Sequence, residues 1–223
     1  MRTINSAKVG FVLLAVLFVL LGIISGKHLV AVLFAQPLAL NTIELLPKPK
    51  PLPAVLLRNA NGDAFPRENF SGSWSLVFFG FTSCPDFCPM ELQKLGQLIK
   101  FAEQDKRDVQ VVFVSVDPER DVPEKLVQYV TFFHPKIIGL RGDNPAIASF
   151  ARFFGATYDR SAVIEGKAVI IPAGVAMPAS VGEQYLVNHS TRVFIIDPQR
   201  RYVGSINNAG SPDIVWADLL KLF

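Results

Sequence analysis

Cysteine and histidine are scarce in this chain, which has two cysteines and three histidines among 223 residues. Basic runs are missing as well, and 22 lysines and arginines against 19 acidic residues leave a net charge of only +3. A nucleic-acid partner is therefore not expected, because such partners require a concentrated positive surface. No internal repeat is visible, so a repeat architecture is excluded. Hydrophobic residues are plentiful at 50%, enough for a sizeable core.

Acidic residues are absent before Glu44, and an uncharged run of eighteen residues fills positions 9–26. This length is at the lower end of what crosses a bilayer, and Arg2 and Lys8 precede the run. We expect a cytoplasmic N-terminus at 1–8, a transmembrane helix at 9–26, and a single-pass protein of a bacterial inner membrane with its C-terminal domain in the periplasm. A cleavable signal peptide is the competing interpretation, but its apolar core is usually shorter.

Residues 27–53 are expected to be a juxtamembrane segment and a proline-rich linker. The stretch 41–53 holds four prolines and two lysines, which is typical of a semi-rigid spacer. In the alternative interpretation its final residues pack along the domain as an ordered arm. The remaining residues 54–223 suit one domain of about 170 residues.

Apolar, β-branched runs alternate with segments of helical periodicity through residues 54–223. This alternation predicts an α/β fold whose largely parallel sheet is covered by helices on both faces. Antiparallel hairpins are expected at the last two strands, joined by 198–201, and at the opening residues 54–58 with a turn at 61–63. Such a mixed sheet flanked by helices is compatible with a thioredoxin-like fold. Strands are expected at 74–79, 109–116, 137–140, 162–171, 186–197 and 202–206, and helices at 90–104, 123–133, 145–154 and 213–222.

The two cysteines, Cys84 and Cys88, lie where the predicted strand 74–79 leads into the predicted helix 90–104. At this spacing in a first helical turn both sulfurs lie on one face, and the helix dipole favours thiolate over thiol. Two adjacent thiolates either bind a soft metal or form a Cys84–Cys88 disulfide. A bridge over so short a loop constrains the unfolded chain little, so a functional pair is favoured over a stabilising one.

His189 is the candidate third ligand, because it immediately precedes the apolar strand residues 192–196. A loop at the entrance of this strand could bring the imidazole over the cysteine turn. Two thiolates and one imidazole suit copper in both oxidation states, Cu(I) and Cu(II), and zinc also accepts this donor set. His134 is expected to pack at a helix end, and His28 to lie beside the apolar N-terminal run.

Two carboxylates and two methionines near the motifs have ordinary interpretations beside functional ones. Asp86 is expected to be a charge partner of the helix N-terminus rather than a group that tunes the thiolates. Asp117 either supports a metal ligand or simply forms a turn, and both interpretations stay open. Met90 and Met177 are soft donors but are expected to pack.

Four blocks of the sequence resemble the Sco/SenC family, in order and from about residue 54 to the C-terminus. They are FGFT at 79–82, CPDFCP at 84–89, VSVDPERD at 114–121, and HS at 189–190 before a strand that ends in IDP. The family often has Asp before the histidine, where this chain has Asn188. The segment 162–181 is unusually apolar, either as a mobile loop that carries His189 or as an exposed docking patch.

The resemblance implies a thioredoxin-like domain that binds one copper ion through Cys84, Cys88 and His189. It also implies assistance in assembling the binuclear copper centre of cytochrome c oxidase, as a metallochaperone, as a thiol reductant of that centre, or as both. The expected partners are then the copper-bearing oxidase subunit and periplasmic copper carriers or thiol reductants.

Two enzymatic alternatives compete with a copper carrier. In a thiol–disulfide oxidoreductase of the same fold, Cys84 would attack, Cys88 would resolve, and copper would be incidental. A peroxide-reducing enzyme is the third hypothesis. A carrier is favoured over either enzyme.

Overall fold

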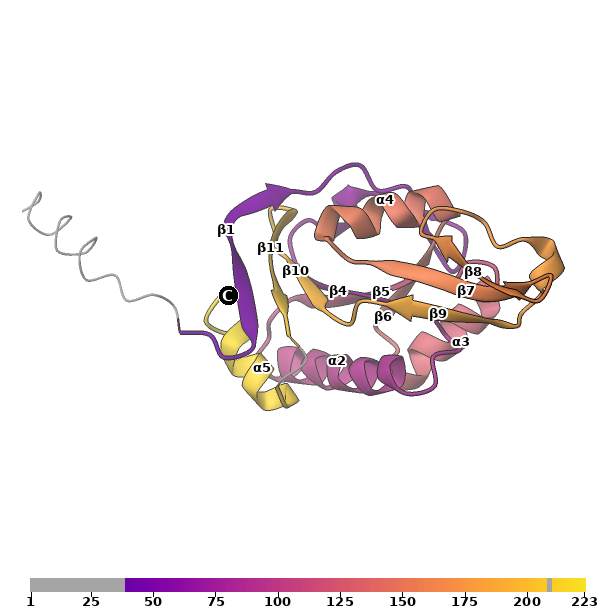
Figure 1. Cartoon of the computed structure of the whole chain (residues 1–223). Helices are drawn as coiled ribbons and strands as arrows, with labels where there is room; N and C mark the ends of the chain where they lie inside the picture. Colours follow the sequence, from indigo (N-terminus) through magenta and orange to yellow (C-terminus); the bar gives the residue numbers. More distant parts are fainter. Residues whose placement is uncertain (1–38, 208–209) are drawn as a thin grey trace, which may run out of the picture. The chain divides into compact units, whose positions relative to one another are not determined.

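A computed structural model of the chain describes residues 39–207 and 210–223 (Figure 1). Within it, residues 40–223 form one compact unit. Two β-sheets and four α-helices make up this unit, with short 3-10 turns at Arg67–Phe70 and Ala179–Val181. The mixed α/β fold predicted from the sequence is confirmed.

The larger sheet has eight strands in the order β1-β11-β10-β4-β5-β6-β2-β3. Its central strands β4, β5 and β6 are parallel, and the flanking pairs are antiparallel. The strands are β1 (Ile43–Pro51), β2 (Leu57–Asn59), β3 (Ala64–Phe65), β4 (Trp74–Gly80), β5 (Val109–Ser115), β6 (Ile137–Arg141), β10 (Val193–Ile196) and β11 (Arg201–Ile206). Both predicted hairpins, β2 with β3 and β10 with β11, are present.

Helices cover both faces of this sheet. In Figure 1, α2 and α5 lie on one side of the sheet and α4 on the other. Alternate side chains of β4 enter opposite cores: Leu76 and Phe78 pack with α2, α3 and α5, whereas Val77 and Phe79 pack with α4. Because both faces of the central strands are buried, these strands appear in the sequence as continuous apolar runs. The helices are α2 (Phe87–Gln104), α3 (Pro123–Phe133), α4 (Asn144–Phe154) and α5 (Pro212–Leu219).

The second sheet has three antiparallel strands in the order β8-β7-β9, with β7 at Tyr158–Ile164, β8 at Lys167–Pro172 and β9 at Tyr185–His189. The predicted strand 162–171 is therefore wrong, since it is a hairpin that turns at Glu165 and Gly166. Both turn residues have positive φ, 50° and 74°. The predicted strand 186–197 is also two strands, β9 and β10, which belong to different sheets.

The proline-rich stretch differs from the expected linker, because Ile43–Pro51 is the edge strand β1 and pairs antiparallel with β11. A register shift between Leu45 and Lys50 contains two of the prolines. An edge strand tolerates proline because one side of it needs no backbone donors. The stretch is therefore ordered from Ile43 onward, whereas the ordered-arm interpretation applied to its final residues alone.

The expected membrane localisation is corrected by the structure. In the described part of the chain, no helix combines the length and the apolar character that a bilayer-spanning segment needs. The longest, α2, has 18 residues but carries Glu91, Lys94, Lys100 and Glu103 among its charged side chains. The single-pass inner-membrane placement with a periplasmic domain is therefore not supported, and the proposed anchor at 9–26 lies outside the described residues.

Candidate metal centre

Cys84 and Cys88 lie at the junction of β4 and α2. Cys88 is in the first turn of the helix and is fully buried, whereas Cys84 precedes the helix and is half-buried. The sequence placed both in a helical turn, but Pro85 disfavours the helical conformation for the residue before it. Pro89 is tolerated because its position in the first turn needs no backbone donor.

The two cysteines nevertheless face each other. Both are free thiols, and the backbone N–H of Cys88 points to Cys84 Sγ at 3.5 Å. The turn between them thus folds one sulfur over the start of the helix, next to the other. The Cys84–Cys88 disulfide stays a prediction.

His189 reaches the sulfurs from the second sheet. It is the last residue of β9, where it pairs with Tyr158 of β7. Its Nε2 lies 3.4 Å from Cys88 Sγ, and its Nδ1 lies 2.9 Å from the carbonyl oxygen of Ser190. A carbonyl only accepts, so Nδ1 carries the hydrogen and the Nε2 lone pair faces the sulfurs. The rings of Phe78 and Phe81 pack edge-on against the imidazole.

The three candidate donor atoms, two Sγ and one imidazole nitrogen, all lie within 4.8 Å of one another. Burial raises the pKa of the Cys88 thiol and lowers the pKa of His189. For Cys88, desolvation outweighs the helix dipole that the sequence suggested would favour thiolate. At neutral pH the centre therefore holds a Cys88 thiol and a neutral imidazole, and metal binding would displace the thiol proton.

Asp121 holds the loop that precedes Cys84, and sequence reasoning did not single it out. This fully buried carboxylate accepts from Thr82 N at 3.0 Å, Thr82 Oγ1 at 2.5 Å and Ser115 Oγ at 2.6 Å. The contacts tie the cysteine loop to the end of β5. The only signal for this role was the place of Asp121 in the VDPERD block.

Asp117 contacts none of the three candidate ligands. It is fully buried and accepts from the hydroxyl of Tyr185 and from Arg120 Nε at 2.5 Å. The Arg120 guanidinium lies 3.9 Å over the Tyr185 ring and also donates to the Tyr185 carbonyl at 3.1 Å. Since Tyr185 begins β9, this cluster fixes the start of the strand that ends in His189.

The connection between β8 and β9 is held by a second charge cluster, formed by the buried Arg160 and the partly exposed Glu119. Glu119 accepts from Met177 N at 2.8 Å, Asn144 Nδ2 at 2.9 Å and Arg160 Nη1 at 2.9 Å. Arg160 is fully buried and also donates to the carbonyl of Val175. The apolar segment 162–181 is thus a hairpin and a connection fastened to the VDPERD block rather than an irregular loop. Val163, Val169 and Ile170 are exposed on the hairpin, so the docking-patch interpretation stays a prediction.

The other candidates from the sequence are not part of the three-donor cluster. Asp86 is exposed and makes no capping hydrogen bond, and Met90 is exposed on α2. Met177 packs in the small core of the second sheet. His134 is buried at the end of α3, where its Nδ1 accepts from Lys136 N at 3.2 Å. His28 lies outside the described residues.

Comparison with known proteins shows one consistent relationship. The SCO1/SenC family model matches residues 55–223. An SCO2-like protein of Rickettsia prowazekii is 35% identical over 147 residues, covering 66% of this chain and 64% of that protein. The mitochondrial protein SCO1 homolog 1 of Arabidopsis thaliana is 37% identical over 152 residues, covering 68% and 40%. In both, the match spans less than two thirds of the relative's length.

Solved structures give the same relationship. Arabidopsis thaliana ScoI with copper bound matches with a TM-score of 0.63 and 34% identity, covering 76% of this chain and 95% of that one. Apo Sco1 from Thermus thermophilus matches with a TM-score of 0.61 and 33% identity, covering 81% and 96%. Bradyrhizobium japonicum ScoI with copper bound matches with a TM-score of 0.62 and 27% identity, covering 77% and 98%.

Proposed function

The chain belongs to the SCO1/SenC family, and from this membership and its three-donor cluster we propose that it carries copper for the assembly of cytochrome c oxidase. One ion is held by Cys84 Sγ, Cys88 Sγ and His189 Nε2, within a copper-binding domain at residues 54–223. The observation that carries the proposal is the convergence of three donors from positions 101 residues apart. The solved relatives with copper bound support copper as the metal.

The donor set fits copper in either oxidation state. Thiolate sulfur favours Cu(I), and imidazole with thiolate suits Cu(II). The lone pair of His189 Nε2 already points to the sulfurs, because Nδ1–H is held by the Ser190 carbonyl. Zinc accepts the same set, so the metal is decided by titration rather than by geometry.

The burial of the donors suggests how the copper ion is bound and released. Cys84 is half-exposed while Cys88 is fully buried. The Cys84 sulfur is therefore the donor that an acceptor's thiolate approaches first, and transfer proceeds by stepwise exchange of thiolates. Cys88 loses its proton on loading and regains one on release. The copper-bearing subunit of the oxidase is the proposed acceptor.

The same arrangement favours a second activity, reduction of the acceptor's cysteines. An exposed thiol beside a buried one is the usual order of an attacking and a resolving cysteine. Cys84 would attack an acceptor disulfide and form a mixed disulfide, which releases one acceptor thiol. Cys88 would then attack Cys84 Sγ and release the second acceptor thiol. The acceptor gains two electrons, and Cys84 and Cys88 are oxidised to a disulfide. That disulfide offers no thiolate, so oxidation abolishes copper binding.

Copper titration of the metal-free, full-length protein tests the proposal. We expect sub-micromolar binding of one ion, lost by more than about 100-fold in Cys88→Ser and in His189→Ala, because each variant removes a donor. His134→Ala is the matched control, since that histidine lies away from the centre and should leave affinity unchanged. Binding that survives loss of Cys88, or a stronger preference for zinc, contradicts the proposal.

A redox assay separates the two activities. We expect the protein with oxidised cysteines to bind copper far more weakly than the reduced protein, and equal affinity would refute the gating. Thiol–disulfide exchange that persists in His189→Ala while copper binding fails identifies the reductant activity as independent of the metal. Peroxide consumption with a thiol donor would favour the third hypothesis.

A further inference from the structure

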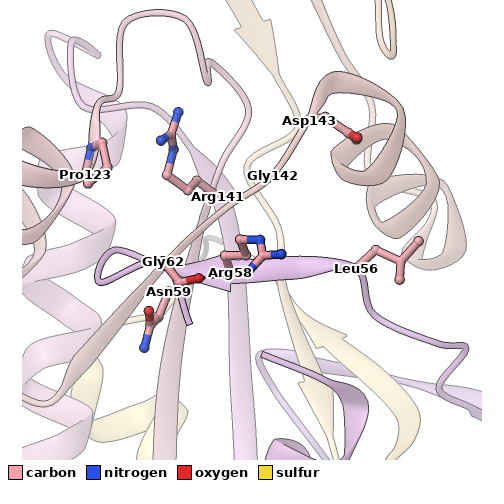
Figure 2. A pocket seen from close by; sticks show the side chains of 8 residues that line it. All are labelled: Leu56, Arg58, Asn59, Gly62, Pro123, Arg141, Gly142 and Asp143. Carbon is pink, nitrogen blue, oxygen red and sulfur yellow. Dashed lines mark hydrogen bonds between the residues drawn. The ribbon is translucent and has the colours of Figure 1, made fainter. Parts of the chain in front are cut away.

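A cavity of about 480 Å³ opens between the start of α3, the start of α4 and the strand pair β2–β6 (Figure 2). This volume is within the range of small-molecule sites. None of the metal-centre donors lines it. Its lining residues are Leu56, Arg58, Asn59, Gly62, Pro123, Arg141, Gly142 and Asp143.

Two arginines occupy paired positions on the strands that form one wall of this cavity, and both side chains line it (Figure 2). Arg58 on β2 lies directly opposite Arg141 on β6 in the antiparallel register. Like charges placed directly opposite in a sheet destabilise the pair. Neither arginine forms an ion pair within residues 39–207 and 210–223. The fold therefore keeps, at the wall of a cavity, two arginines without an ion-pair partner among the described residues.

The guanidinium groups retain donors for a ligand. Arg58 Nη1 donates to the carbonyl of Gly62 at 2.8 Å, and Arg141 Nη2 donates to the carbonyl of Pro118 at 3.1 Å. Arg141 Nε is buried and has no hydrogen-bond partner in the part of the chain that the structure describes, so a ligand would contact this group through its Nη hydrogens. Each group has five N–H donors in a fork that matches the oxygens of a carboxylate or phosphate.

The start of α3 favours a bound anion, whereas the acidic residue at the cavity opposes one. Pro123 is the first residue of α3, so the positive end of that helix dipole lies at the wall. Asp143 is the acidic member of the lining, and its Oδ1 accepts from Ala146 N at 2.8 Å as the N-cap of α4. Its negative charge opposes an anion at this end of the cavity, so the anion is expected on the side of the arginines.

We propose that this cavity binds the oxyanion group of a small molecule, a phosphate or a carboxylate, held between Arg58 and Arg141. The anion lies between the two cationic groups and relieves their repulsion. This inference does not depend on the metal centre or on copper transfer.

Isothermal titration of the metal-free, full-length protein in chloride buffer, with inorganic phosphate, pyrophosphate and citrate as probes, tests the proposal. We expect at least one probe to bind with a dissociation constant of about 1 mM or tighter, as two charge-assisted contacts provide. Binding of the phosphates alone identifies a phosphate site, and binding of citrate alone a carboxylate site. Failure of all three probes overturns the proposal.

Three variants make the test specific. Arg58→Gln and Arg141→Gln should each weaken binding by about tenfold or more. Arg107→Gln, which removes an exposed arginine outside the cavity, should stay within about twofold of wild type. In the absence of ligand, Arg58→Gln should be at least as stable to urea as wild type, because it removes a like-charge pair. Equal weakening by Arg107→Gln, or none by the cavity variants, refutes the site.

Discussion

Replacing Arg160 with methionine removes a fully buried charge that ties three segments together. Its Nη1 donates to Glu119 Oε2 at 2.9 Å, and its Nη2 donates to the carbonyl of Val175. Glu119 in turn accepts from Asn144 Nδ2 and Met177 N. Since Arg160 lies on β7, beside the strand that ends in the candidate histidine ligand, the change loosens both the β8–β9 connection and the support of that strand.

The size of the effect follows from the surroundings of the pair. Removing one member of a buried ion pair lowers the free energy of unfolding by about 3–5 kcal/mol. The Glu119 side chain is 28% exposed and keeps two other hydrogen-bond donors, so the loss should be at the lower end, about 3 kcal/mol. The lost hydrogen bond to Val175 adds about 1 kcal/mol. Arg160 Nε is buried without a partner among the described residues, and its removal returns about 1 kcal/mol. We expect a net destabilisation of about 3 kcal/mol.

Urea unfolding of wild type, Arg160→Met and Arg160→Lys measures this loss. The lysine variant keeps the charge but not the guanidinium fork, so it should fall between the other two. Arg152→Met is the matched control, because Arg152 is exposed on α4 and its loss should cost within about 0.5 kcal/mol. A loss below about 1 kcal/mol for Arg160→Met, or an equal loss for Arg152→Met, would refute this account of the cluster.

Two further changes test the core and the pH response. Burial alone would raise the pKa of Asp218, but hydrogen bonds from Lys221 and the backbone of Thr42 lower it to about 2 from its ordinary 3.8. The ionised carboxylate therefore stabilises the folded protein fully above pH 3.8, and this contribution is lost as the pH falls toward 2. Asp218→Asn should cost about 1–2 kcal/mol at pH 7 and flatten the acid dependence of urea unfolding, and an unchanged dependence would contradict this. Gly80→Ala places a methyl group 2.7 Å from Cys88 Sγ and 2.8 Å from Phe113 Cε2. It should cost about 1–3 kcal/mol in urea unfolding and weaken copper binding by titration, and a variant equal to wild type in both would rule out this crowding.

The central sheet was predictable because its strands are buried on both faces. The apolar runs of β4 and β5 have no other stable environment, and the helices between them begin within about three residues of the predicted positions. The second sheet was harder, because the end of β7 and most of β8 form one apolar run from Ala162 to Ile171, broken by Glu165, Gly166 and Lys167. A two-residue turn with positive φ at both positions usually has Asn or Asp before its glycine, and glutamate gave a weak signal.

For the candidate centre, residue types identified the donors, but only tertiary structure shows their convergence. Cys84 and Cys88 are close in sequence, so their proximity is a local property. His189 arrives through the pairing of β9 with β7 and through the anchoring of Tyr185 by Asp117, and neither contact has a local signal. The position of Cys84 before the helix depended on Pro85, whose effect on the preceding residue was readable from the sequence.

The donors of the proposed centre come from both sheets, the cysteines from the junction after β4 and the histidine from the end of β9. An ion bonded to Cys88 and His189 links positions 101 residues apart and acts as a removable cross-link. Closing a loop of about 100 residues lowers the entropy of the unfolded chain by an amount worth about 4–5 kcal/mol in the chain-entropy account. The copper-bound protein should therefore unfold at a higher temperature and resist proteases better than the metal-free protein. Release of the ion removes the cross-link and leaves the form that proteases digest more easily.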